Sequence, residues 1–297
     1  LFIDPKSKTL KLFKILRIIF FFLLTVFFVY HGIGLGFRWV ISDHAPWSNG
    51  YEAIIFIAWV TMIFGFVFSR KNAVIIAGTA ILASLMIFVT EMNLLDPEIT
   101  PLVPVLKSYW LMIHVAIITG SYGPLGLAAI LGLINLLLYI FRTQKNGKMI
   151  SIHISELTYV SEMAMTIGVF MLTIGTFLGG VWANESWGRY WAWDPKETWA
   201  LVSVLVYAVI LHFRFIPKLN GKFVFNAVAL WGYSAILFTF FGVNFMLVGL
   251  HSYAQGEGLG EFPNWLIVLI ISFLIFTIFS GIRYKAYKKL NKEKIVE

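Results

Sequence analysis

The chain has 297 residues, of which 59% are hydrophobic and only 13% are charged, and its mean hydropathy is +0.83. Soluble domains carry about 25% charged residues, so this composition indicates a polytopic membrane protein. There is no cysteine, which excludes disulfides, Cys-ligated zinc, iron–sulfur clusters and cysteine nucleophiles within the chain.

Eight apolar segments are each long enough to cross the hydrocarbon core of a bilayer, which needs about 20 helical residues. Their ranges are 12–36, 52–69, 72–90, 109–141, 161–181, 195–214, 223–248 and 264–284. The predicted fold is therefore an all-α, polytopic membrane helix bundle, with one transmembrane domain over residues 1–297. The fourth segment exceeds a perpendicular span by roughly 15 Å. We expect its first part, from Tyr109 to about Thr119, to lie near or above the outer surface.

The basic residues predict the orientation of this bundle. All Lys and Arg lie in or beside alternate connecting segments and the chain ends, except for Arg38, Lys107, Arg189 and Lys196. The positive-inside rule then places both termini in the cytoplasm. The outer side is predicted to hold segments 37–51, 91–107, 182–199 and 249–263. Nucleic acid is disfavoured as a partner, because the basic residues follow one membrane face.

The outer segment 182–199 has the highest density of tryptophan. It contains five of the 11 Trp residues, namely Trp182, Trp187, Trp191, Trp193 and Trp199. Clustered flat rings with polar residues between them favour a platform for a large planar ligand. The alternative is the aromatic belt that membrane proteins place at the bilayer surface, but a belt scatters its rings over several spans. We therefore favour the ligand platform.

The end of this Trp-rich segment has the pattern of a helix start. Asp194 can be the N-cap, Pro195 suits the first helical position, and Glu197 stands where a capping box requires a carboxylate. Capping alone can account for both carboxylates, and a further role in the platform remains an alternative. No nucleophile or metal-binding set accompanies them, so no residue is predicted to act as a general acid or base.

Two of the six histidines flank the Trp-rich segment on the predicted outer side. His114 lies at the outer start of the fourth span, and His251 follows the outer end of the seventh. Two neutral imidazoles could supply both axial ligands of a haem iron, although an interfacial His often has no such role.

The sequence gives a less specific indication of function for His212 and for the remaining His and Arg residues on the predicted outer side. His212 lies about 26 Å along the sixth helix, towards the cytoplasmic side, where an ionisable residue is either functional or interfacial. If His212 is a ligand, it belongs to a second site. We expect structural roles for His31 and His44. Arg38 and Arg189 could contact carboxylates of a ligand or lipid headgroups.

One motif makes the resemblance to a known family specific. The pattern Trp187-Gly188-x-x-Trp191-x-Trp193-Asp194-x-x-Glu197-x-Trp199 resembles the "WWD" signature of haem-handling membrane proteins. The segments His44-Ala45-Pro46-Trp47-Ser48-Asn49 and Tyr109-Trp110-Leu111-x-x-His114 are also similar to that family. Over nearly its full length, the chain resembles the CcsA (ResC) component of the system II cytochrome c synthase. The non-Met start would fit the C-terminal half of a fused CcsBA.

The resemblance implies a haem lyase component that exports haem b and presents it on the outer face of the bacterial inner (plasma) membrane. There, haem is attached through thioether bonds to Cys-x-x-Cys-His of apocytochrome c, mainly by positioning. By resemblance, His114 and His251 are the outer iron ligands, and the WWD segment, Gly188 included, holds the porphyrin. His212 matches a ligand within the membrane whose partner His lies in a CcsB component, separate or fused. Membrane lipid and thiol-reducing proteins are further expected partners.

Two other functions remain alternatives. A membrane electron-transfer protein would also carry haem, but usually between paired His on facing helices in its core. A transporter for another flat aromatic ligand, such as a quinone, would use the Trp platform without iron ligands.

Overall fold

The computed structural model describes residues 8–69, 72–92, 95–99, 108–249, 251 and 264–296. Within these ranges the chain is helical and contains no strand. Eight of the described helices are long and apolar enough to cross a membrane, which confirms the predicted all-α bundle with its eight spans. The predicted outer segments 91–107 and 249–263 lie in large part outside the described residues, as do Arg70, Lys71 and Lys107.

The helices cover the predicted spans, the first and last helices extend beyond them, and two larger differences concern the fifth and seventh spans. The helices are α1 (Lys8–Ser42), α2 (Gly50–Phe68), α3 (Ala73–Thr90), α4 (Tyr109–Phe141), α5 (Gly147–Trp187), α6 (Pro195–His212), α7 (Lys222–Leu237), α8 (Val243–Met246) and α9 (Asn264–Val296). Helix α5 is much longer than the predicted span 161–181. Its first turns bury Ile150, Ile154 and Leu157, whose helical spacing is hidden by intervening polar residues.

The seventh predicted span, 223–248, is the second difference, because it is not one regular helix. A π-helical segment, Phe238–Gly242, interrupts it between α7 and α8. Such π segments are rare and are often found at functional sites.

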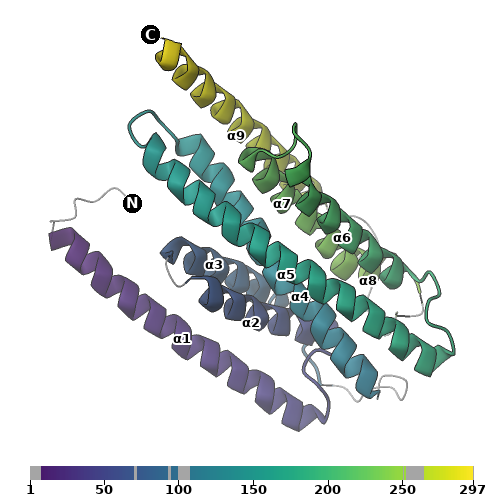
Figure 1. The fold of residues 1–297 in the computed structure, drawn as a ribbon. Coiled ribbons are helices and arrows are strands. Elements are labelled where there is room, and N and C mark those ends of the chain that lie inside the picture. Colours follow the sequence, from purple (N-terminus) through teal and green to yellow (C-terminus); the bar gives the residue numbers. More distant parts are fainter. Residues whose placement is uncertain are drawn as a thin grey trace.

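Helix α4 is the centre of the bundle and packs against α2, α3, α5, α7 and α9 (Figure 1). It runs through Pro124 as one helix. Two glycines let neighbouring backbones approach: a Cβ on Gly132 would lie 2.6 Å from the carbonyl oxygen of Asn226 in α7, and one on Gly123 would lie 3.0 Å from the amide nitrogen of Thr61 in α2. Small residues permit this close packing where the bilayer supplies no hydrophobic driving force between helices.

A buried polar cluster joins α4, α5 and α7. The Asn135 amide donates to the side-chain oxygens of Asn226 at 2.6 Å and of Thr158 at 3.2 Å, and the Asn226 amide donates to Thr158 at 2.7 Å. Interhelical hydrogen bonds of this kind are worth roughly 0.6–2 kcal/mol each in a membrane and set the register of the helices.

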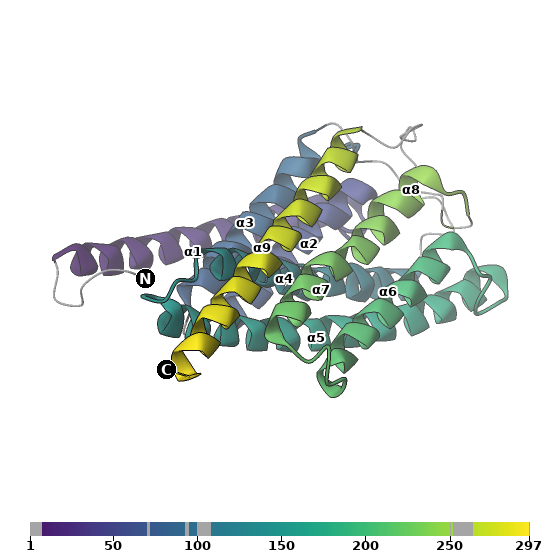
Figure 2. The ribbon, with the colours of Figure 1, turned by 90° about the horizontal axis from the view of Figure 1, so that it is seen from above.

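Helices α1 and α9 lie at the periphery (Figures 1 and 2). Their apolar side chains face outwards; Ile18 and Phe27 on α1 and Ile275 on α9 are more than half exposed. Exposed apolar helices of this length match a lipid environment.

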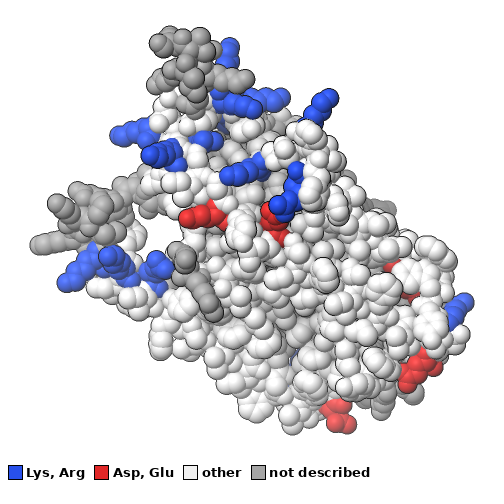
Figure 3. Space-filling model, viewed as in Figure 1, with Lys and Arg blue, Asp and Glu red and all other residues white. Residues whose placement is uncertain are grey.

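Charge separates along the long axis of the bundle. Figure 3 shows most of the described Lys and Arg near the end that carries the chain termini and the α4–α5 connection, with acidic residues at the opposite end as well as among them. The basic residues therefore gather at one end of the bundle, as the sequence predicts. The positive-inside rule predicts that this end faces the cytoplasm.

Candidate functional site

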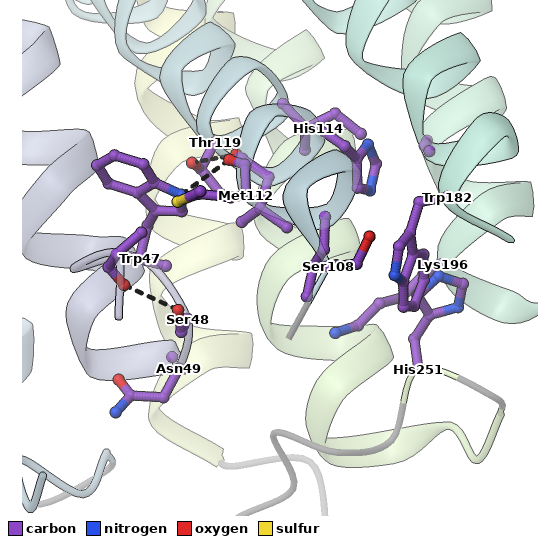
Figure 4. A pocket seen from close by; sticks show the side chains of 18 of the residues that line it. Trp47, Ser48, Asn49, Ser108, Met112, His114, Thr119, Trp182, Lys196 and His251 are labelled. Atoms are coloured by element: carbon purple, nitrogen blue, oxygen red, sulfur yellow. Dashed lines mark hydrogen bonds between the residues drawn. The ribbon is translucent and has the colours of Figure 1, made fainter. Parts of the chain in front are cut away.

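A cavity of about 850 Å³ opens at the end of the bundle where α4 begins and α5 ends. Its walls come from the α1–α2 connection, the start of α4, the end of α5, the α5–α6 connection, the start of α6 and the π segment (Figure 4). Cofactor and small-molecule sites typically occupy about 300–1,000 Å³. The cavity therefore has the size of a site for a large ligand, and its lining includes His114 and His251, the two histidines predicted to lie on the outer side.

Trp182 forms the middle of one wall and is fully buried on α5. Its ring lies nearly parallel to that of His114, with centroids 6.5 Å apart and an interplanar angle of 9°. Trp187 and His251 pack against it with centroids at 4.7 and 5.5 Å. Helix α5 ends at Trp187, so the predicted Trp-rich loop is in fact a helix end, a short connection and a helix start.

His114 is held on α4 by a close contact with α5. Its Nδ1 shares a 2.7 Å hydrogen bond with the carbonyl oxygen of Gly175. The ring lies on Gly179, where an added Cβ would come within 2.4 Å of Cε1 of the imidazole. The other ring nitrogen, Nε2, makes no hydrogen bond with any described residue. An Nδ1 that donates to a carbonyl leaves Nε2 as the metal-binding nitrogen.

His251 is held by a carboxylate in the same manner. Its Nδ1 lies 2.7 Å from Oδ2 of Asp194, which is buried. Gly249 lets this carboxylate approach, because a Cβ there would lie 2.2 Å from Oδ1 of Asp194. Within the described chain, Nε2 of His251 also has no hydrogen-bond partner. A carboxylate–histidine pair fixes the tautomer and raises the basicity of the free nitrogen.

Asp194 also caps α6, as the sequence predicts. Its side chain accepts from the amide of Lys196 at 3.1 Å, and Glu197 accepts from the Asp194 amide at 3.2 Å, which together form the predicted capping box with Pro195 in the first turn. Capping alone therefore does not describe Asp194, because the same carboxylate orients His251.

The other predicted site residues are not all at the cavity. Trp191 lines it, whereas Trp193 has a positive φ of 57° and is 71% exposed. Gly188 ends α5 in the left-handed conformation (φ 71°) and donates to the carbonyl of Asn184. Trp199 packs on Phe238 of the π segment, with centroids 4.1 Å apart. The connection turns the chain between antiparallel helices, so successive Trp rings point in different directions.

His212 lies at the far end of α6 from the cavity. It is the last residue of the helix, its side chain is exposed, and its Nδ1 bonds the carbonyl oxygen of Ala208 at 2.7 Å. The structure therefore separates it from His114 and His251, as the sequence predicts.

The wall opposite the Trp cluster is formed by the α1–α2 connection, a role that is not evident from the sequence. Trp47 spans to α4 by donating to the carbonyl oxygen of Met112 at 3.0 Å. His44, for which a structural role was expected, also lines the cavity. The only advance signal was the polar His-Ala-Pro-Trp-Ser-Asn pattern.

Arg38 forms its contacts outside the cavity. Its guanidinium pairs with the fully buried Glu52 at 2.8 Å and donates to the carbonyl oxygen of Pro97 at 2.9 Å. Glu52 in turn accepts from the amide of Ser48 at 2.9 Å. Arg38 therefore holds the α1–α2 connection in place and is not among the described residues that line the cavity.

Comparison with known proteins gives a consistent family. Residues 47–251 match the family described as cytochrome C assembly protein. NrfI of Wolinella succinogenes is 45% identical over 243 residues, which are 82% of this chain and 27% of that protein. The chain thus spans about a quarter of the length of NrfI.

Two relatives of more similar length bear the name cytochrome c biogenesis protein CcsA. That of Guillardia theta is 35% identical over 242 residues, covering 74% of this chain and 80% of the relative. That of Prochlorococcus marinus is 36% identical over 245 residues, covering 73% and 78%. The chain therefore belongs to the cytochrome c assembly protein family, as a multi-pass membrane protein of cytochrome c biogenesis.

Proposed function

We propose that the protein holds haem b in the outer cavity, between His114 and His251, and presents it for covalent attachment to apocytochrome c. The observation that carries the proposal is that the two histidine rings are held in the same way. Each has its Nδ1 in a 2.7 Å hydrogen bond, to Gly175 and to Asp194, and each lines the same cavity. Both rings are thereby oriented with Nε2 available, as a bis-histidine iron site requires.

The ring of the porphyrin has a suitable environment beside these ligands. Trp182 and Trp191 line the cavity, and Trp187 supports His251 from behind with ring centroids 5.0 Å apart. Aromatic faces of this kind pack against a flat apolar ligand and exclude water. Trp193, Trp199 and Gly188 would act on haem only indirectly, through the shape of the connection and the start of α6.

The chemistry proposed for this haem lyase component is an addition reaction without net oxidation. Bound haem supplies the two vinyl groups: each thiol of Cys-x-x-Cys-His adds to one, with a C–S bond formed at one carbon and hydrogen at the other. The residues of this chain contribute orientation, because they fix the ring while the substrate peptide approaches. No acid or base within the chain is needed for that role.

The rest of the assembly follows from the same proposal. The cavity faces outwards from the bacterial inner membrane, both termini are cytoplasmic, and a CcsB component, separate or fused, completes the synthase. His212 then belongs to a second haem site, with a His of CcsB as its partner. Thiol-reducing proteins would keep the apocytochrome cysteines available.

The absorption spectrum of the purified protein with added haem tests the outer site. We expect a six-coordinate, bis-His spectrum in the wild type and at least a roughly 10-fold loss of affinity in His114→Ala and in His251→Ala. His153→Ala is the matched control, because this α5 residue does not line the cavity. Unchanged spectra in both cavity variants would refute the ligand assignment.

Absence of any Soret band in the wild type would favour a transporter of another flat aromatic ligand. Co-expression with a Cys-x-x-Cys-His apocytochrome and the CcsB component tests attachment through covalently bound haem. Electron transfer without attachment would favour the electron-transfer alternative.

A further inference from the structure

Lys196 is a cation in the wall of the cavity, and its sequence context alone indicates no ligand role. It lies in the first turn of α6, immediately after the Asp194 cap and Pro195. Its backbone amide donates to the Asp194 side chain, and the residue lines the cavity. Figure 4 shows this side chain running from α6 beneath Trp182 into the cavity, on the side of Ser108. The ammonium group therefore lies beside the aromatic wall and near both histidines.

The described protein groups leave this ammonium group without a salt bridge, and Asp194 is the carboxylate that attracts it electrostatically. Lys196 is the only Lys or Arg among the described residues that line the cavity, and it forms no salt bridge with a described carboxylate. Asp194 is occupied by His251 and the helix cap. Glu197 accepts from the backbone amides of Ala192 and Asp194.

An ammonium group that lacks a salt bridge in the wall of this cavity has an energetic consequence. Removing a charge from water without a partner costs several kcal/mol unless a counter-ion or hydrogen bonds replace the lost hydration. Because Lys196 faces the cavity, the missing partner would come from the bound ligand. A ligand that satisfies this wall is flat and apolar over most of its area and carries an anionic group at its edge.

We infer that Lys196 binds a propionate carboxylate of the porphyrin held in the cavity, and so determines which edge of the ring faces α6. This inference rests on the proposed haem-binding function. It gives the two ends of the ring different environments: the carboxylate edge lies at the ammonium group of Lys196, and the apolar vinyl edge lies away from it. Such an anchor acts through charge and hydrogen bonding to the ligand edge and not through the iron.

The test compares two porphyrins with the purified full chain. Haem b and its dimethyl ester have the same ring, iron and vinyl groups, but the ester has no carboxylates. We expect the wild type to bind haem about 10- to 100-fold more tightly than Lys196→Met does, the range for a hydrogen bond to a charged group. The affinity for the dimethyl ester should be the same in both proteins, and Lys196→Arg should retain most of the affinity for haem.

Two controls keep the outcome specific. Lys148→Met removes an exposed lysine at the far end of α5 and should bind both porphyrins like the wild type. The spectrum of haem in Lys196→Met should keep its bis-His bands, because both iron ligands remain.

The inference is overturned if Lys196→Met weakens both porphyrins equally, leaves both unchanged, or alters the iron spectrum as an axial ligand would. If the wild type binds neither porphyrin, the proposed haem-binding function fails as well, so the two failures are distinguishable.

Discussion

Replacing Gly179 with alanine tests how the His114 ring is positioned, because it adds a single methyl group where the ring packs. The added Cβ would lie 2.4 Å from Cε1, 2.8 Å from Nδ1 and 3.0 Å from Nε2 of the imidazole, so the ring must move. Overpacking of this kind costs about 1–3 kcal/mol. Alanine recovers about 1 kcal/mol through its higher helix propensity. We therefore expect the free energy of unfolding to fall by about 0–2 kcal/mol.

The effect of Gly179→Ala on haem should be larger than its effect on folding. Moving the ring breaks its 2.7 Å hydrogen bond to Gly175 and misdirects Nε2. Loss of such an orienting contact typically lowers metal affinity about 10- to 100-fold. The assay is a haem titration followed by absorption, with thermal unfolding measured on the same samples.

Gly34→Ala is the matched control, because a Cβ at that α1 position meets no atom within 4 Å. It should leave both haem affinity and the bis-His spectrum unchanged. If Gly179→Ala bound haem with wild-type affinity and spectrum, the assignment of His114 as a seated iron ligand would be refuted.

Further substitutions separate the roles of Asp194 and His212. Asp194→Asn should keep the α6 cap, because Asn caps as well as Asp, but it should lower haem affinity about 10- to 100-fold through loss of the carboxylate at His251. Asp194→Ala should in addition lower the free energy of unfolding by about 0.5–2 kcal/mol. Equal haem affinity in Asp194→Asn and wild type would contradict the orienting role. His212→Ala should reduce the amount of cellular haem that copurifies with the protein, while the affinity of the purified protein for added haem stays the same. A lower affinity for added haem in that variant would show that the two ends of α6 are not independent sites.

Several features of this protein could be read from local sequence. The lengths of the apolar segments predict the eight helices, because each span must satisfy its backbone hydrogen bonds within the helix and cover the bilayer core. The cap at Asp194 and Glu197 is equally local, since the spacing of residues within one turn determines it. His114 and His251 could be named as candidates because they stand at the outer ends of their spans.

Other local patterns were incomplete guides to shape. The polar residues before position 161 concealed the first turns of α5, whose burial depends on contacts with α4. The π segment at Phe238–Gly242 has no evident sequence pattern. It brings Thr239 and Phe240 to the cavity and supports Trp199.

Only the tertiary structure decided what the Trp-rich segment contributes to the site. Its five Trp residues lie close together in the sequence, yet Trp182 is fully buried beside His114 while Trp193 is 71% exposed. The difference arises because α5 ends between them and the chain reverses direction. The same reversal directs Lys196 into the cavity, and the pairing with Glu52 holds the Arg38 guanidinium elsewhere. Composition and spacing determine that eight apolar, membrane-length helices form. The direction of each side chain depends on helix ends and close glycine contacts that join residues far apart in the chain.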